Sequence, residues 1–165
     1  MNAARFLRHL FFTRWTTRRY FTPQVLAGIE AAIRETETLH GGEIRFVVET
    51  ALDLAELAHD LAPRRRALQV FGQLGVWDTE HNNGVLIYLL LADRMVEIVA
   101  DRGIAARIAQ SEWEGVCREM ELQFRQRRFA EGSVAGIRGV GRLLSRHFPA
   151  RRAPANELPD QPVLL

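Results

Sequence analysis

The sequence predicts a single α/β domain in which a small mixed β-sheet carries helices on both faces. Three observations lead to this prediction. Residues 43–49 alternate as a strand does, with apolar side chains on one face. A helical stretch separates them from an apolar strand at 84–91, and a further strand at 95–100 follows three residues later. The first two strands should therefore be parallel with a right-handed crossover, and the last two should form an antiparallel hairpin.

The helix before the first strand has recognisable ends. Thr22 and Pro23 provide an N-cap and a first-turn proline, and the Gly41-Gly42 pair should end the helix. The apolar residues between these ends fall on one helical face: Val25, Leu26, Ile29 and Ile33.

The crossover between the first two strands should be helical from 53 to 74, with a break near Pro63. The strand that follows Gly84 has seven consecutive apolar residues, which fits a strand buried on both faces. In the strand 95–100, Glu97 should occupy the wetter face. The residues of the crossover that should face the core are Leu68, Phe71 and Leu74.

Two amphipathic helices are expected after the hairpin. Ser111 with Glu114 matches a capping box, so Ser111 is interpreted as a helix cap rather than a nucleophile. The last helix should run from 129 to 147, where its glycines permit close packing. The first of these helices carries an apolar stripe, which makes Cys117 a core residue: Trp113, Val116, Cys117, Met120 and Phe124.

The 165 residues divide into a basic, aromatic N-terminal arm (1–21), the α/β domain (22–148) and a proline-rich, irregular tail (149–165). All 22 basic residues are arginines, and five of them precede the first acid, Glu30. The remainder holds 17 arginines against 20 acidic residues, so nucleic-acid binding by the domain is not expected.

A single cysteine excludes a disulfide framework, and no apolar run is long enough to cross a bilayer. The N-terminus does not match a signal peptide either, so a cytoplasmic location is expected, at most peripheral to the inner membrane. The arm itself, residues 5–20, leaves two interpretations open. Its aromatic residues could lie on an anionic lipid surface with the arginines at the headgroups. Alternatively, some apolar residues pack onto the domain, the candidates being Phe6, Leu10, Phe11 and Trp15.

Because the hairpin is antiparallel, the loop before its first strand and the residues after its second strand should meet at one edge of the sheet. We call this edge the acidic rim. Its oxygen-bearing side chains are of the types that bind Ca²⁺ or Mg²⁺: Asp78, Glu80, Asn82, Asn83 and Asp101. The same residues are common in ordinary turns, and Gly84 could serve only to relieve a tight entry. The opposite edge ranks second and carries Glu49, Asp53, Asp93 and Arg94.

Residues 43–148 resemble the TPM domain family, most closely a bacterial subgroup described as TPM-domain or membrane proteins. The resemblance rests on EIRFVVE, on NNGVLIYLLLADRMVEIVADRGI and on GSVAGIRGVGRLL, and the tail residues 156–160 (NELPD) are similar too. The resemblance implies weak acid-phosphatase activity, divalent-cation binding, and association with membranes or LemA-type membrane proteins.

Two functions follow from these expectations. The first is a binding or assembly module near the membrane that contacts a membrane surface or a LemA-type protein through residues 5–20, with a Ca²⁺ or Mg²⁺ ion on the acidic rim. The alternative is a slow, metal-assisted acid phosphatase in which Glu43, Asp101 and Arg102 are the catalytic candidates. No nucleotide-binding or standard nucleophile motif is present, and the five histidines lack zinc-ligand spacing.

Overall fold

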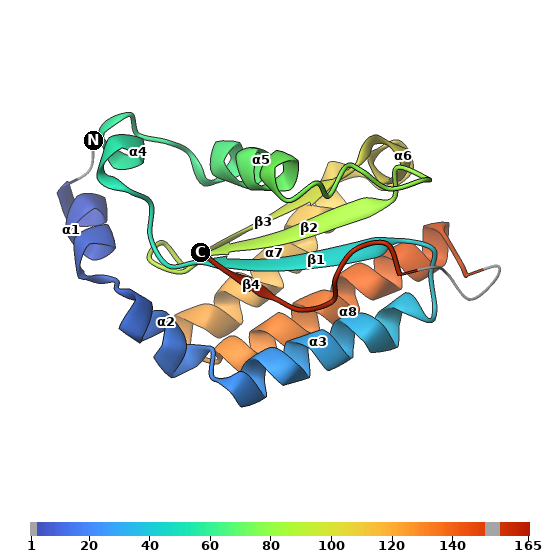
Figure 1. The fold of residues 1–165 in the computed structure, drawn as a ribbon, viewed down its shortest axis with the longest axis horizontal. Coiled ribbons are helices and arrows are strands. Elements are labelled where there is room, and N and C mark those ends of the chain that lie inside the picture. The colour runs from blue at the N-terminus through green and yellow to red at the C-terminus, as the bar shows by residue number, and fades with distance from the viewer. Residues whose placement is uncertain (1–2, 151–155) are drawn as a thin grey trace.

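The computed structural model describes residues 3–150 and 156–165, which form a three-layer α/β fold around a four-stranded sheet (Figure 1). The strand order is β3-β2-β1-β4. Strands β1 (Glu43–Glu49) and β2 (Gly84–Leu90) are parallel, while β2 and β3 (Met95–Ala100) are antiparallel. The predicted β-α-β unit, hairpin and fold class are confirmed.

The C-terminal segment contributes a strand that the sequence did not reveal. Strand β4 (Val163–Leu164) pairs in parallel with β1, and the Leu165 N–H donates to the Val48 carbonyl at 2.9 Å. The expectation of an irregular tail is wrong for these residues; Pro154 of that tail lies outside the described residues. Strand β1 would otherwise present an open row of backbone donors and acceptors, so even a two-residue strand gains hydrogen bonds there.

One face of the sheet is covered by three long helices, α3 (Pro23–Glu37), α7 (Gln110–Arg125) and α8 (Phe129–His147) (Figure 1). Helix α8 packs closely because its glycines lack a side chain. A methyl group on Gly136 would lie 2.1 Å from the Met120 sulfur, and one on Gly141 would lie 2.8 Å from Thr36 Cβ. The predicted packing role of these glycines is confirmed.

The other face is covered by the crossover helices α4 (Leu54–Ala58) and α5 (Pro63–Gln73) (Figure 1). Helix α5 buries Ala67 and Val70, whereas Leu68 is 49% exposed. The expectation that Leu68 faces the core is therefore wrong. Ala67 and Val70 lie on the buried face, Phe71 and Leu74 pack beside it while partly buried, and Leu68 falls about 100° away from Ala67 around the helix. Strand β2 is buried along its whole length between the two layers, as predicted.

Two helix boundaries differ from expectation. Helix α3 ends at Glu37, four residues before the Gly41-Gly42 pair. The N-cap of α7 is Ala109 rather than Ser111, which lies exposed in the first turn. The Glu112 carboxylate accepts the Ala109 N–H at 3.4 Å, which is one of the two hydrogen bonds of a capping box. The other would need a side-chain acceptor at the N-cap, which alanine lacks.

The N-terminal arm forms two helices, α1 (Ala3–Phe11) and α2 (Arg14–Tyr20), beside the end of the sheet where the β2–β3 turn lies (Figure 1). A short helix, α6 (Arg102–Ala105), lies at the opposite end. Among the described residues, no helix has the length and apolar character needed to cross a membrane.

Candidate functional site

The acidic rim assembles at the end of the sheet beside α6. The Asp101 N–H donates to the Gly84 carbonyl at 2.8 Å, and the Gly103 N–H donates to the Asn82 carbonyl at 3.2 Å. The Arg102 Nε donates to Asn82 Oδ1 at 2.8 Å. The structure thus brings Asn82, Asn83, Asp101 and Arg102 together, as the hairpin argument required.

Two glycines make this approach of backbones sterically feasible. A methyl group on Gly84 would lie 1.9 Å from the Val76 carbonyl oxygen, and one on Gly103 would lie 2.5 Å from the Asn82 carbonyl oxygen. Any side chain at either position would push the 76–83 loop away from the sheet. Gly84 thus allows the loop to pass close to the start of β2, and this close approach also shapes the rim.

Within residues 3–150 and 156–165, two buried oxygens on the rim have no hydrogen-bond partner. The Asn83 amide nitrogen donates to the Gly41 carbonyl at 2.6 Å, which fixes the amide orientation and leaves Asn83 Oδ1 unpaired. Asp101 caps α6, since its Oδ1 accepts the Arg102 N–H at 2.7 Å, but its Oδ2 is also buried and unpaired. Buried polar atoms without partners are rare and costly, so these oxygens suit a water molecule or a cation.

The remaining candidate ligands lie at the surface. Asp78 and Glu80 are exposed, and no hydrogen bond or ion pair involves either carboxylate within the described part of the chain. In residues 3–150 and 156–165, no group of three or more His, Cys, Asp and Glu side chains is placed to hold a metal. A cation on the rim would therefore need an amide oxygen, backbone carbonyls or water beside at most two carboxylates.

Glu43 is engaged by the C-terminal segment. Its Oε2 accepts the backbone N–H groups of Glu157 and Leu158, each at 3.1 Å, and burial raises its pKa above the usual range. Burial also raises the pKa of nearby Glu37 from 4.5 to about 8, and repulsion from Glu43 and Asp160 adds to this effect. These carboxylates form a buried acidic cluster under the tail, so Glu43 is not positioned as a free catalytic base.

At the opposite edge, Glu49 is held in a structural network. Arg66 donates to both Glu49 oxygens, with Nη2–Oε1 at 2.7 Å and Nε–Oε2 at 2.9 Å. The Tyr88 hydroxyl donates to the same carboxylate, and burial raises the pKa of Tyr88. Asp53 caps α4 by accepting the Glu56 N–H at 2.7 Å. Glu49 thus ties α5 to the sheet, whereas Asp53 serves as the N-cap of α4.

Asp93, in the β2–β3 turn, binds the N-terminal arm. Arg5 Nε lies 2.9 Å from Oδ2, and Arg8 Nη2 lies 3.4 Å from Oδ1. His9 Nε2 is 3.1 Å from Oδ1, an electrostatic contact outside hydrogen-bond geometry. Burial alone would raise the pKa of Asp93, but His9 and Arg5 outweigh burial and lower the pKa. Asp93 is thus a buried anchor for α1 rather than a solvated turn residue.

The comparisons with known proteins now identify the fold family. A model of the TPM domain matches residues 17–143. The chain belongs to the TPM domain family. This TPM domain is similar to the solution structure of the BA42 protein from the psychrophilic bacterium Bizionia argentinensis. The two share 31% identity over 87% of this chain and 94% of that chain, with a TM-score of 0.75.

Two further solution structures share the fold of this TPM domain. The N-terminal domain of a P. gingivalis protein is 22% identical, covers 74% of this chain and 76% of its own, and has a TM-score of 0.56. The N-terminal domain of the cg2496 protein from Corynebacterium glutamicum is 15% identical, with 74% and 73% covered and a TM-score of 0.54. A search of curated proteins returned no match.

Sequence reasoning missed two parts of this TPM domain. The contact between Glu43 and the tail joins residues 114 and 115 positions apart, and the contact between Arg5 and Asp93 joins residues 88 apart. No local pattern signals either pairing. The sequence did place Asp93 in a tight turn, and in the structure Arg94 takes a positive φ of 52° there.

Proposed function

We propose that this TPM domain is a binding module that attaches to an anionic membrane surface through helix α1. The observation that carries the proposal is the outward position of three apolar side chains. Leu7, Leu10 and Phe11 are 51%, 55% and 74% exposed. Their i, i+3, i+4 spacing puts them on one face of the helix, which we call the α1 apolar face.

The opposite face of α1 is fixed to the domain. The Leu52 N–H donates to the buried His9 Nδ1 at 3.0 Å, Phe6 packs against the core beneath α4 and α5, and Arg5 binds Asp93. Of the apolar residues considered for packing, Phe6 is the one that packs, while Trp15 on α2 is 68% exposed. Because α1 is anchored, its apolar face cannot turn inward, and burial in a bilayer interface would remove it from water.

The charges around this face suit anionic lipid. Residues 3–20 include Arg5, Arg8, Arg14, Arg18 and Arg19, and no acidic residue. The Arg19 guanidinium carbon lies 5.6 Å from the centroid of the Trp15 ring, a cation–π contact. Aromatic and cationic side chains of this kind are favoured at the boundary between lipid headgroups and acyl chains. Each arginine near an anionic surface contributes about 1 kcal/mol, and each apolar side chain fully buried contributes roughly 1.5–3 kcal/mol.

Vesicle flotation tests the proposal. The wild-type chain should float with phosphatidylcholine vesicles that contain phosphatidylserine, and the triple variant Leu7→Ser/Leu10→Ser/Phe11→Ser should bind at least about tenfold more weakly. The matched control Leu39→Ser/Leu122→Ser removes exposed leucines elsewhere and should float like the wild type. If wild type and triple variant float equally, the α1 apolar face is not the membrane contact. If neither floats, membrane attachment itself is overturned, and a pull-down would then test a LemA-type membrane protein as the partner.

A second candidate function, divalent-cation binding on the acidic rim, is favoured by the unpaired Asn83 Oδ1 and Asp101 Oδ2. Carboxylate and amide oxygens are ligands for Ca²⁺, and a site with one carboxylate should be weak. In an amide-NMR titration, Ca²⁺ should shift the signals of Asn83, Gly84 and Asp101. Asp101→Asn keeps an oxygen that can cap α6 but loses the charge, so its signals should not move. Equal shifts in both proteins would place the cation elsewhere.

The hydrolytic alternative has less support in this arrangement. Glu43 accepts two backbone hydrogen bonds, and Arg102 donates to Asn82 rather than standing free. The alternative predicts that aryl-phosphate hydrolysis in the presence of Mg²⁺ falls in the Asp78→Ala/Asp101→Ala double variant. Equal hydrolysis by variant and wild type would remove it.

A further inference from the structure

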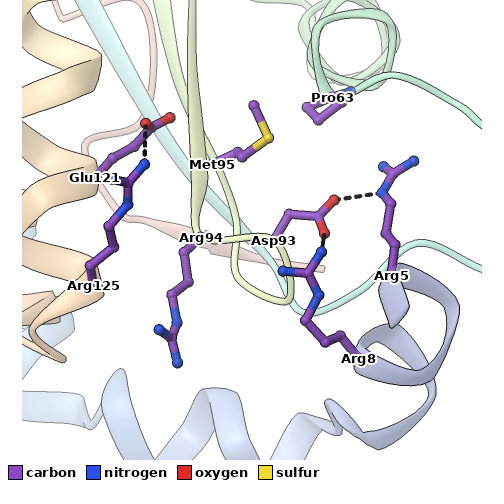
Figure 2. Close-up of a pocket in the computed structure, with 8 residues that line it drawn as sticks. All are labelled: Arg5, Arg8, Pro63, Asp93, Arg94, Met95, Glu121 and Arg125. Atoms are coloured by element: carbon purple, nitrogen blue, oxygen red, sulfur yellow. Dashed lines mark hydrogen bonds and ion pairs between the residues drawn. The ribbon is translucent and has the colours of Figure 1, made fainter. Parts of the chain in front are cut away.

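A solvent-open pocket of about 500 Å³ lies where α1 meets the β2–β3 turn and the end of α7 (Figure 2). Its charged lining comprises Arg5, Arg8, Asp93, Arg94, Glu121 and Arg125, and we call it the arginine pocket. Four guanidinium groups face two carboxylates, so the lining carries an excess of two positive charges. Like charges held around one opening repel each other, and a dianion would neutralise the excess.

The arginines of the pocket are not equally available. Arg5 is mostly buried and satisfied, because it binds Asp93, Asp60 at 3.2 Å and the Leu61 carbonyl at 3.0 Å. Arg94 differs: within the described residues its guanidinium has no hydrogen bond or ion pair. Arg125 makes one loose contact, 3.9 Å to Glu121, and its side chain is largely exposed.

Arg94 is flanked by two arginines that are loosely paired, Arg8 with Asp93 at 3.4 Å and Arg125 with Glu121 at 3.9 Å. Figure 2 shows the Arg94 side chain between those of Arg8 and Arg125, which come from α1 and α7. The planar fork of an arginine matches two oxygens of a phosphate group, and three such forks around one opening suit a phosphate better than a carboxylate. Met95 and Pro63 add an apolar part to the lining.

The pocket adjoins the α1 apolar face. Around the helix, Arg8 lies about 60° from Phe11, so the residue that borders the apolar face also lines the pocket. A lipid whose acyl chains contact Leu7 and Phe11 would therefore bring its headgroup toward Arg8 and Arg94. We propose that the arginine pocket binds the phosphomonoester headgroup of an anionic lipid such as phosphatidic acid. The inference rests on the membrane attachment proposed above and names the lipid chemistry that the attachment selects.

Flotation on two kinds of vesicle tests this inference with the full chain. Phosphatidylcholine vesicles carry either phosphatidic acid or phosphatidylserine, adjusted to the same surface charge. The wild type should bind the phosphatidic acid vesicles at least about tenfold more tightly, the equivalent of one charge-assisted hydrogen bond. Arg94→Gln/Arg125→Gln should lose this preference and bind both vesicles as the wild type binds phosphatidylserine. Arg118→Gln/Arg146→Gln removes the same charge from exposed helix positions and should keep the preference.

The outcomes separate the two proposals. Equal binding of the wild type to both vesicle types overturns the headgroup pocket while leaving membrane attachment standing. A preference that survives in Arg94→Gln/Arg125→Gln, with unchanged thermal melting, also overturns it. Absence of flotation overturns both. An amide-NMR titration with inorganic phosphate then tells whether the pocket takes a free ion: shifts at residues 93–95 without vesicle binding would assign a soluble phosphate in place of the lipid.

Discussion

Substitution of Gly84 by alanine should destabilise this TPM domain strongly. The added methyl carbon would lie 1.9 Å from the Val76 carbonyl oxygen, and such pairs do not approach within 3.0 Å, so the 76–83 loop or the start of β2 must move by about 1 Å. The movement strains two backbone hydrogen bonds, from Asp101 to Gly84 at 2.8 Å and from Glu43 to Asn83 at 3.0 Å. Overpacking costs about 1–3 kcal/mol and each of the two weakened hydrogen bonds up to about 1 kcal/mol, so a loss of about 3–5 kcal/mol is expected.

Urea unfolding followed by far-ultraviolet circular dichroism measures this loss, and the melting temperature should fall by about 6–20 °C. Gly28→Ala is the matched control. Gly28 lies exposed in the middle of α3, and its added methyl group would meet nothing within 4 Å. Because alanine restricts the unfolded chain, this variant should gain about 0.5–1 kcal/mol. A Gly84→Ala protein within about 0.5 kcal/mol of the wild type would refute the steric argument.

Three further predictions concern the buried groups and the tail. Because burial raises the pKa of Glu37 from 4.5 to about 8, the folded state binds more protons in this range, and this group makes the free energy of unfolding fall as pH rises from 4.5 to 8. Glu37→Gln should therefore gain in urea midpoint over the wild type from pH 5 to pH 8, and a constant difference would contradict the assignment. Burial raises the pKa of the Cys117 thiol to about 12, so the native protein should react with a thiol reagent at pH 8 far more slowly than the urea-unfolded chain; similar rates would show an accessible thiol. Deletion of residues 156–165 removes buried Leu158 and uncovers the edge of β1, so stability should fall by about 2 kcal/mol or more and size-exclusion chromatography should reveal association; an equally stable monomer would show that β4 is dispensable.

Most of the fold could be predicted because its signals are local. The apolar run after Gly84 gave a strand buried between two helical layers, and the three-residue connection at 92–94 forced β3 to run antiparallel to β2. Helix α8 begins at Phe129 and ends at His147 as its periodicity indicated. The same connectivity predicts that Asn82 and Asp101 lie at one edge of the sheet, as they do.

The sites depended on tertiary structure. Local patterns did not indicate that residues 163–164 would complete the sheet. Nor did they indicate that the Glu157 and Leu158 N–H groups would donate to the Glu43 carboxylate, or that Arg5 would bind Asp93. Leu68 points outward although its residue type suits a core. Hydrophobic periodicity acts between neighbours along the chain, so the sequence by itself determined the layers, the strand directions and the meeting of the rim loops. Whether a charged group is buried, and whether a short edge strand pairs, depends on which sequence-distant segment packs beside it. Only the tertiary structure therefore decided which polar groups have partners and which do not.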